Sequence, residues 1–406
     1  MKRMRSCAGL VAVVLLVLGT ATAEDWPQFR GVARDGVSSE TGLARSWPES
    51  GPPVRWNVDL GAGYSGLAVV DGRLFTLFSE GKDEFAVSLD AATGEERWRK
   101  RIDDAWNDRM GDGPRSTPTV DGERVYALSS GGKLWAFAAA GGDVVWSLDL
   151  RKDYAAKPPR WGASTSPLVE GKLLIVDAGG GDGSSVVAFD KTTGKEVWRS
   201  QDDKPGYSAP IAITVSGVRQ VIVFTGSRVV SLAPQDGSLY WDMPWKTAYD
   251  VNAATPVFVP PDKLFVSSGY DHGAVLLRLE AADGKVVPRQ VWDTRTMKNQ
   301  FSSSVLHDGH LYGFDDKTLR CIAVETAETK WRERGFGHGS LLYADGHLIV
   351  LGDDGRLALI EATAAGYRLR SSFQLFDAKT WTMPTLVDGT LYVRDEKRLV
   401  ALDVSE

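Results

Sequence analysis

Gly142-Asp-Val-Val-Trp146 is the stretch that decides the fold, because the chain of 406 residues repeats its pattern. A glycine followed four residues later by tryptophan, or the tryptophan alone, recurs at Gly94-Glu-Glu-Arg-Trp98, Gly194-Lys-Glu-Val-Trp198, Gly237-Ser-Leu-Tyr-Trp241, Trp292 and Trp331. From Trp98 onward, the tryptophans of this pattern are 48, 52, 43, 51 and 39 residues apart. A period of about 45 residues with several short apolar stretches per unit is typical of β-propeller blades.

The unit that ends at Trp146 shows how one blade is built. Its apolar stretches, Ser116–Val120, Val125–Leu128 and Leu134–Phe137, are separated by the pairs Asp121-Gly122 and Gly131-Gly132. Asp-Gly and Gly-Gly favour tight turns because both central residues take positive φ. Each unit is therefore predicted to be a four-stranded antiparallel sheet. Seven complete units begin near Tyr64, Arg115, Ser164, Tyr207, Asn252, Phe301 and His338.

The two ends of the repeat region each hold part of one further blade. Val54–Leu60 has the pattern of a fourth strand, but no first three strands precede it. Trp381–Gly389, Leu391–Arg394 and Leu399–Asp403 supply three strands without a fourth. Pairing the strand around Trp56 with them closes the ring and leaves no long unpaired edge. We therefore predict an all-β fold, an eight-bladed β-propeller formed by residues 54–404.

Residues 1–23 have the pattern of a secretory signal peptide. A basic start at Lys2, Arg3 and Arg5 precedes the apolar stretch Ala8–Leu18, and Ala21-Thr-Ala23 is an A-x-A cleavage site. The apolar stretch is too short to favour a membrane-spanning helix. We expect export to the periplasm or the extracellular space, with no transmembrane segment after cleavage. Residues 24–53 contain two tryptophans and a phenylalanine, which predicts an N-terminal extension packed on the propeller.

Charge and cysteine content exclude several classes of function. Cleavage of the signal removes three basic residues and changes the formal net charge from −6 to −9. No basic stripe remains, so nucleic acid is not an expected partner. Cys321 is then the one cysteine left, and no intrachain disulfide is possible. His307-Asp-Gly-His310 has the pattern of a hairpin turn, and no metal site is predicted. We expect a monomer.

The repeated tryptophans are expected to be structural. An indole buries a large area and still offers one N–H to a carbonyl of the next blade. The sixth unit has Ala327 where glycine is expected, and the seventh lacks both glycine and tryptophan around Tyr367, so those two joints should be less regular. The predicted blade-docking residues are Trp56, Trp98, Trp146, Trp198, Trp241, Trp292 and Trp331.

The unit from Ser116 to Trp146 resembles the repeat of pyrroloquinoline-quinone-like (PQQ-like) propellers, in which Gly-x-x-x-Trp docks adjacent blades. The resemblance covers essentially all of Val54–Val404. The superfamily includes quinoprotein alcohol dehydrogenases and BamB, a propeller lipoprotein of outer-membrane β-barrel assembly that has no cofactor. Further segments resemble exported bacterial members, mostly of unassigned activity: Asp25–Gly31, Gly113–Pro118, Pro159–Gly162, Ser267–Tyr270 and Gly337–Ser340.

The candidate ligand site lies where the first strands begin, since this end of each blade lines the mouth of the channel. Aromatic faces with two or three arginines suit a small, flat, anionic ligand such as PQQ, and would equally suit a peptide or a glycan. A purely structural role, in which the rings fill the channel, is the alternative. The candidate residues are Tyr64, Arg115, Arg160, Trp161, Tyr207, Asn252, Tyr270, Phe301, His338 and Trp381.

Two interpretations of function follow. In the first, which we favour, the protein is a ligand- or protein-binding module or scaffold in the cell envelope and not an enzyme. In the second it is a PQQ-dependent oxidoreductase, for which the resemblance implies calcium, a carboxylate base, a tryptophan floor and a disulfide between adjacent cysteines. The sequence has no adjacent cysteines and no haem-binding Cys-x-x-Cys-His, so an external electron acceptor would be required. No catalytic residue or calcium ligand can be assigned.

Overall fold

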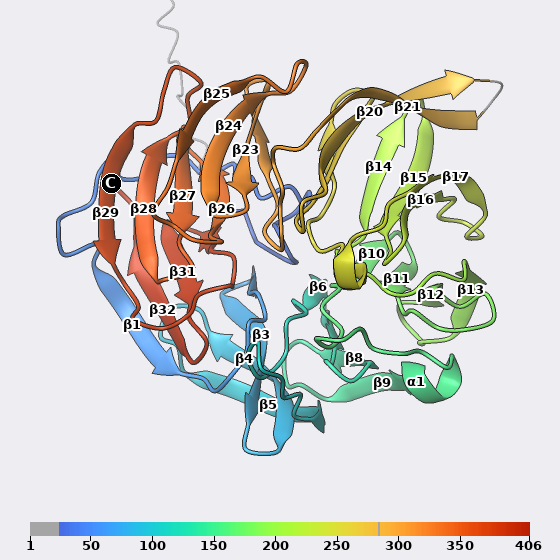
Figure 1. Ribbon diagram of the computed structural model, residues 1–406. Coiled ribbons are helices and arrows are strands. Elements are labelled where there is room, and N and C mark those ends of the chain that lie inside the picture. Colours follow the sequence, from blue (N-terminus) through green and yellow to red (C-terminus); the bar gives the residue numbers. More distant parts are fainter. Residues whose placement is uncertain (1–23, 283–284) are drawn as a thin grey trace, which may run out of the picture.

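The computed structural model describes residues 24–282 and 285–406, so the predicted signal peptide, residues 1–23, lies outside the described residues. Eight four-stranded sheets stand around a central axis like the blades of a propeller (Figure 1). Every pair of neighbouring strands within a blade is antiparallel. The predicted all-β, eight-bladed propeller is confirmed.

The first four complete blades follow the chain outward from the axis, and each ends in its outermost strand. Their strands are β2 (Ala68–Val70), β3 (Arg73–Glu80), β4 (Asp83–Asp90) and β5 (Glu96–Asp104); β6 (Thr119–Asp121), β7 (Arg124–Leu128), β8 (Lys133–Ala138) and β9 (Val144–Asp149); β10 (Leu168–Glu170), β11 (Leu173–Asp177), β12 (Val186–Asp190) and β13 (Glu196–Ser200); β14 (Ile211–Val215), β15 (Val218–Phe224), β16 (Arg228–Leu232) and β17 (Leu239–Pro244).

The remaining blades continue in the same order, and the last is shared between the two ends of the described chain. Their strands are β18 (Val257–Val259), β19 (Lys263–Ser268), β20 (Gly273–Ala282) and β21 (Lys285–Thr294); β22 (Val305–His307), β23 (His310–Asp315), β24 (Thr318–Ala323) and β25 (Thr329–Glu333); β26 (Ser340–Ala344), β27 (His347–Leu351), β28 (Arg356–Glu361) and β29 (Leu369–Gln374); β30 (Thr385–Val387), β31 (Thr390–Arg394), β32 (Arg398–Asp403) and β1 (Val54–Asp59).

In residues 24–282 and 285–406, helical structure is limited to two single turns. Helix α1 (Leu150–Asp153) follows β9, and its N-terminal residue is capped by Asp149, whose side chain accepts from the Arg151 N–H. The 3₁₀ turn η1 (Ala248–Asp250) follows β17. In the ranges that the structure describes, neither element has the length and hydropathy needed to cross a bilayer.

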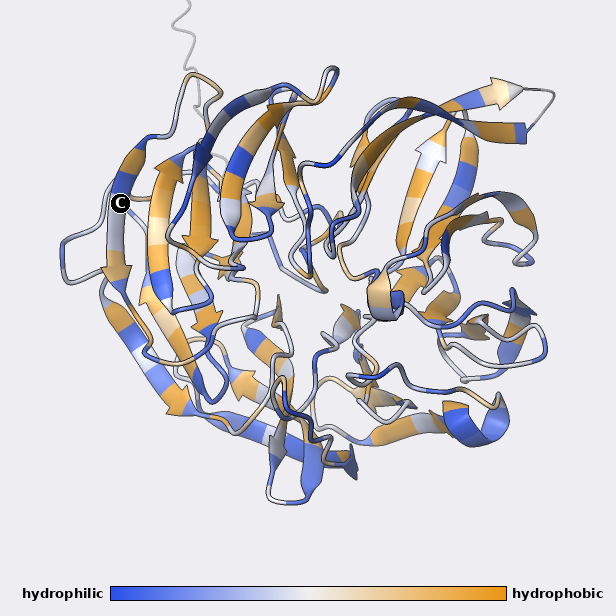
Figure 2. Ribbon diagram, in the orientation of Figure 1, coloured by the Kyte–Doolittle hydropathy of each residue, from blue (hydrophilic) through white to orange (hydrophobic). Residues whose placement is uncertain are grey.

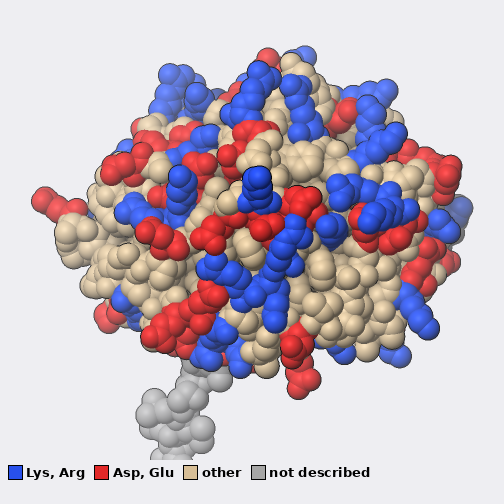
Figure 3. Space-filling view, turned by 90° about the horizontal axis from the view of Figure 1, so that it is seen from below, with Lys and Arg blue, Asp and Glu red and all other residues tan. Residues whose placement is uncertain are grey.

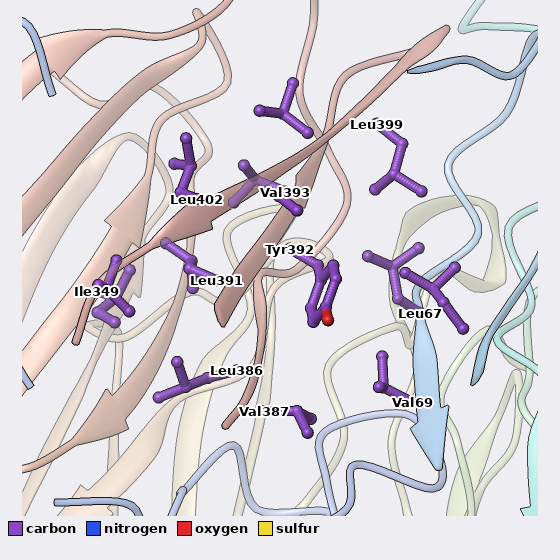
Figure 4. Close-up of a cluster of buried hydrophobic side chains, with 14 of the residues drawn as sticks. Leu67, Val69, Ile349, Leu386, Val387, Leu391, Tyr392, Val393, Leu399 and Leu402 are labelled. Atoms are coloured by element: carbon purple, nitrogen blue, oxygen red, sulfur yellow. The ribbon is translucent and has the colours of Figure 1, made fainter. Parts of the chain in front are cut away.

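The ring closes as the sequence predicts, because β1 pairs with β32 and completes the blade β30-β31-β32. Trp56 stands opposite Ala401 in this pair. Buried apolar side chains from the last two blades and the first blade pack together at the seam (Figure 4). The strands carry many apolar residues (Figure 2), and buried apolar clusters join other neighbouring blades. Burial of this continuous surface is what makes the ring a single unit.

Contacts between tryptophan and glycine join one blade to the next. The Trp98 Nε1–H donates to the Ala139 carbonyl at 2.9 Å, and the indole lies against Gly142, whose φ is +70°. A methyl group on Gly142 would lie 2.6 Å from that ring. The same N–H bond to a carbonyl of the next blade is made by Trp56 to Ala91, Trp146 to Lys191, Trp198 to Pro234, Trp292 to Val324 and Trp331 to Thr363.

The sixth blade is more regular than the sequence predicts, and an irregular joint lies elsewhere in the ring. Trp292 and Trp331 keep their bonds to the next blade, and Ala327 adopts the positive φ, 57°, that glycine has elsewhere. The exception is Trp241, whose N–H donates at 3.0 Å to Gln220 Oε1 within its own blade. The neighbouring strands β20 and β21 continue past the usual turn as a long hairpin, so the blade next to Trp241 has strand residues where the other blades turn.

The N-terminal extension crosses the end of the channel that lies opposite Tyr64 and Trp381. The Trp26 N–H donates to Val69 O at the end of β2, at 2.8 Å. The Ser38 N–H then donates to Tyr343 O in β26 at 2.8 Å, and Ala44 N–H to Val404 O at 2.9 Å. The segment therefore passes from the first blade to the seventh and then to the eighth, visible as the dark blue chain behind the orange strands in Figure 1.

One buried carboxyl group makes the stability of the fold dependent on pH. Asp177, at the end of β11, is 3% exposed; its Oδ2 accepts from the Gly206 N–H at 3.0 Å, and Oδ1 has no partner. Thr165 lines the same small enclosed cavity, and its hydroxyl also has no partner. Burial raises the pKa of Asp177 from 3.8 to about 7. The folded state therefore retains this proton over a range in which the unfolded chain has lost it.

We expect Gly142→Ala to lower the free energy of unfolding by about 2 kcal/mol or more. The added methyl group forces a left-handed alanine, costing about 1–2 kcal/mol, and displaces the Trp98 indole. Urea unfolding of the purified protein measures the change. Gly141→Ala is the matched control: its nearest contact would be Asp143 Oδ2 at 3.5 Å and its φ is not positive, so a change within about 1 kcal/mol is expected. Equal losses in the two variants would contradict the docking role.

We expect Asp177→Asn to gain stability relative to the wild type as pH rises. Because the folded pKa is raised, the proton's contribution to wild-type stability is complete below about pH 4 and is lost as pH approaches 7. The neutral amide has no such loss. Urea unfolding at pH 5 and pH 8 measures the difference between the two proteins, with the exposed Asp143→Asn as control. A difference that does not change between these pH values would refute the assignment.

Candidate functional site

Two arginines of the N-terminal extension close one end of the channel. Arg34 is 3% exposed and donates to Ser166 O and Pro210 O, both at 3.1 Å, and to Pro167 O. Arg30 is 2% exposed and donates to Ser304 O at 2.7 Å and Ser303 O at 3.3 Å. Burial lowers the pKa of Arg34 to about 9 and that of Arg30 to about 10, so both remain charged at neutral pH.

The first strands supply the carbonyl groups that these guanidinium ions meet. Pro118, Pro167, Pro210, Pro256 and Pro384 each directly precede the innermost strand of a blade. A proline has no N–H, so its position presents an acceptor without a donor toward the axis. Several such acceptors around one axis favour a cation with many N–H groups, which describes arginine. Arg30 and Arg34 therefore act as a plug at one end of the channel, and the open channel becomes a cup.

The walls of the cup come from one equivalent position in the blades. In seven of the eight blades, the residue three positions before the proline, or before its counterpart, lies at a cavity of about 190 Å³. Phe29 and Arg30 of the extension line the same cavity. No aspartate or glutamate lines it. The residues at the equivalent position that line the cavity are Tyr64, Arg115, Ser164, Tyr207, Ala253, Phe301 and Trp381.

The aromatic rings form two groups. On one wall, the ring of Trp381 lies 5.2 Å from that of Tyr64 and 5.0 Å from that of Phe301, between centroids. The other group, which we call the aromatic track, consists of Tyr207, Trp161, Tyr249 and Tyr270. Its successive centroid distances are 5.7, 6.4 and 6.2 Å. Tyr207 is buried, whereas Tyr249 is 64% and Tyr270 36% exposed, so the track leads from the cup to its rim.

Arg115 lines the cup and is engaged in an ion pair with the loop that precedes it. Its guanidinium pairs with Asp108 Oδ2 at 3.0 Å and donates to Gly111 O at 2.8 Å and Gly113 O at 3.1 Å. The side chains of Arg115 and Asp108 are each only 14% exposed. Arg115 also lies 5.6 Å from the centroid of the Tyr64 ring. It therefore holds the loop 105–113 in place, and its charge is balanced before any ligand arrives.

Two other cations lie on the aromatic rings at the rim. The Arg160 guanidinium is 5.5 Å from the centroids of both Trp161 and Tyr249. Lys379 Nζ is 4.2 Å from the centroid of Trp381 and donates to Met110 O at 2.7 Å. Within the described ranges, neither side chain pairs with a carboxylate. Both cations are available to an anionic group on a ligand while the rings orient them.

Seven of the ten candidate residues line the cup: Tyr64, Arg115, Trp161, Tyr207, Tyr270, Phe301 and Trp381. Arg160 lies beside them at the rim. The prediction of Asn252 was wrong: this side chain is fully buried, donates to Thr225 O at 2.8 Å and accepts from Thr247, and the next residue, Ala253, occupies the mouth position.

His338 also lies outside the cup, although its ring is 5.6 Å from that of Phe301. Its Nδ1 is 3.6 Å from Asp353 Oδ2, and it lines a neighbouring polar cleft with Lys298 and Arg334. Desolvation lowers its pKa despite that carboxylate.

Sequence reasoning missed Phe29, Arg30, Arg34, Tyr249 and Lys379. The one available signal was the pair of arginines within a segment too apolar for a free tail.

The residues of the cup do not fit a calcium-bound quinone well. Calcium takes six to eight oxygen ligands, usually including carboxylates, and no carboxylate lines the cavity. Within the described residues, no three His, Cys, Asp or Glu side chains gather as a metal site would require. The nearest acidic partner of the site, Asp108, is bound to Arg115. The aromatic walls suit a ring-shaped ligand, but they supply no calcium ligands.

Comparison with known proteins places the chain among PQQ-like propellers. Over 188 residues it is 28% identical to the serine/threonine-protein kinase AfsK of Streptomyces griseus, covering 45% of this chain and 22% of that protein. Over 223 residues it is 30% identical to the quinohemoprotein alcohol dehydrogenase ADH-IIG of Pseudomonas putida, covering 47% and 30%. The chain thus matches less than a third of the length of either relative.

Solved structures show the same fold at low sequence identity. BamB from Moraxella catarrhalis superposes with a TM-score of 0.62 at 14% identity, covering 86% of this chain and 96% of that one. The ADHIIG dehydrogenase of Pseudomonas putida HK5 gives 0.66 at 13% identity, covering 94% and 80%. A family profile, "Outer membrane protein assembly factor BamB", matches residues 48–159 and 105–333, together more than half of the sequence. The chain therefore belongs to this family of PQQ-like β-propellers.

Proposed function

We propose that the protein is an exported binding module or scaffold of the cell envelope that recognises its ligand or partner through the aromatic cup. One observation carries the proposal. The channel is closed at one end by Arg30 and Arg34 and is lined toward the other by exposed and half-buried aromatic rings. Apolar concave sites with a few polar groups are typical of ligand recognition. In this proposal the protein acts as a monomer in the periplasm or outside the cell.

The arrangement of charges supports binding more than catalysis. A general base must lie within hydrogen-bond reach of the proton it removes. Asp108 is the acidic side chain associated with the site, and Arg115 and the loop 105–113 hold it in an ion pair. Stabilising the ionised carboxylate in this way reduces its strength as a base. The family description, which names an assembly factor, supports the envelope setting.

We expect Trp161→Ala and Trp381→Ala each to weaken capture of an envelope partner by the purified protein. Truncating a central aromatic anchor typically costs about 2 kcal/mol or more. Affinity capture from detergent-solubilised envelopes, followed by measurement of the dissociation constant of the recovered partner, tests this. Leu369→Ala is the control, because Leu369 is 41% exposed on the outer strand β29, away from the cup. Equal capture by all variants would rule out the cup as the recognition site.

We expect no saturable binding of PQQ, with or without calcium, up to high micromolar concentration. The physical reason is the lack of carboxylate ligands in the cup and the prior pairing of Arg115 with Asp108. Tryptophan quenching and calorimetry of the purified protein provide the measurement. Saturation at one PQQ per chain that is lost in Trp161→Ala would instead favour the oxidoreductase interpretation and justify a screen of alcohol substrates.

A further inference from the structure

The aromatic track and its two cations carry an inference about the class of ligand, and it rests on the proposed function because it concerns the same site. We propose that the cup and the track bind a carboxylated oligosaccharide, that is, a chain of sugar rings bearing uronic acid groups. The apolar faces of the sugar rings would lie on the aromatic rings. Their carboxylates would pair with Arg160 and Lys379.

The length of the track favours a ligand with several rings. It starts at the buried Tyr207 in the wall of the cup and continues through Trp161 to Tyr249 and Tyr270 at the rim. A single planar molecule in the cup would leave Tyr249, which does not line the cavity, uncovered. Tyr249 and Tyr270 are 64% and 36% exposed, and Tyr249 meets Trp161 and Tyr270 edge to face at interplanar angles of 76° and 73°, so the rings offer differently oriented faces to a chain that extends out of the cup.

The backbone at the outer end of the track is held in an unfavourable conformation. Tyr249 has φ of 65° and Tyr270 has φ of 53°. Bulky side chains in this left-handed region cost about 1–2 kcal/mol each, and such residues concentrate at binding and active sites. In both cases the strained residue is the one that presents its ring to the track. A turn with no binding role would be satisfied at lower cost by glycine or asparagine.

The distribution of charge favours an anionic ligand and opposes a cationic one. No acidic residue lines the cup, and the guanidinium of Arg160 already lies on the faces of Trp161 and Tyr249. Lys379 covers Trp381 in the same way. A quaternary ammonium group would therefore meet like charge at the rim. A ligand with apolar faces and carboxylates at its edges matches both features.

An extended peptide fits the site less well than a sugar chain. Peptides that bind to sheets pair with a free strand edge. Six of the eight innermost strands, among them β2, β6 and β30, are only three residues long, and proline precedes β6 and β30. The channel carbonyls at the far end are occupied by Arg30 and Arg34. Sugar rings need no such edge, because stacking and side-chain contacts suffice.

The test uses the mature chain and oligogalacturonates as probes. Calorimetry measures binding of the monomer, the trimer and the hexamer, together with a hexamer whose carboxylates have been reduced to alcohols. We expect the acidic hexamer to bind about tenfold or more tightly than both the acidic monomer and the reduced hexamer, a difference of about 1.4 kcal/mol. Equal affinity for the acidic and reduced hexamers, or for monomer and hexamer, would overturn the proposal.

Variants locate the binding. Arg160→Gln and Tyr249→Ala should each weaken hexamer binding about tenfold. Arg97→Gln, an exposed arginine on the outer strand β5 that pairs with Asp90, is the matched control and should bind as the wild type does. Both test residues are exposed, and an unchanged midpoint of unfolding verifies that the variants fold.

The outcome also separates this proposal from the proposed function. If no oligogalacturonate binds while capture of an envelope partner still depends on Trp161, the ligand class is overturned and the binding module stands. If oligogalacturonate binding and partner capture are both insensitive to Trp161→Ala, both proposals fail. Hexamer binding that Arg97→Gln reduces as much as Arg160→Gln does would indicate general attraction of a polyanion, and would also overturn the proposal.

Discussion

The structure depends on how the free edges of eight innermost strands are satisfied where they meet on one axis. Each edge presents backbone carbonyls toward the channel. The prolines there have no N–H group that could donate a hydrogen bond to these carbonyls. Buried acceptors without partners cost free energy, and bulk water is excluded from the narrow end of the channel. Arg34 resolves this by donating to carbonyls of two blades, the third and the fourth, and Arg30 donates to the sixth. Two guanidinium ions thus replace solvent at the centre of the ring.

The same arrangement determines the shape of the candidate site. Because the extension enters from one end only, it closes the channel there and leaves a cup at the other. Phe29 and Arg30 then form part of the cup's lining. The extension is fixed by backbone bonds to β2 and β26 and to Val404 beyond β32. These backbone bonds reach blades on both sides of the closing seam, so the extension reinforces the seam while it forms the floor of the site (Figure 1).

Sequence reasoning succeeded where a signal repeats and failed where it does not. The Gly-x-x-x-Trp period and the missing strands around Trp56 predicted the number of blades and the closure. Asn252 was misplaced by one residue because its blade lacks an aromatic marker, although counting three residues back from Pro256 gives Ala253. The ion pair of Arg115 was not predicted because its partner Asp108 lies in an aperiodic loop. Arg30 and Arg34 were missed since their partners are more than a hundred residues away. Acidic and basic side chains are intermingled on the face shown in Figure 3.

Residues outside the repeat therefore give this propeller its individual chemistry. The repeated positions supply a scaffold that serves relatives as different as a kinase and a dehydrogenase, so they carry little information about a ligand. The plug, the loop held by Arg115 and the strained turns at Tyr249 and Tyr270 all lie between strands or before the first blade. Loops tolerate change that the blade faces cannot, because the faces are packed against neighbours on both sides. Specificity in this family should accordingly be sought in how such inserted segments close and line the mouth.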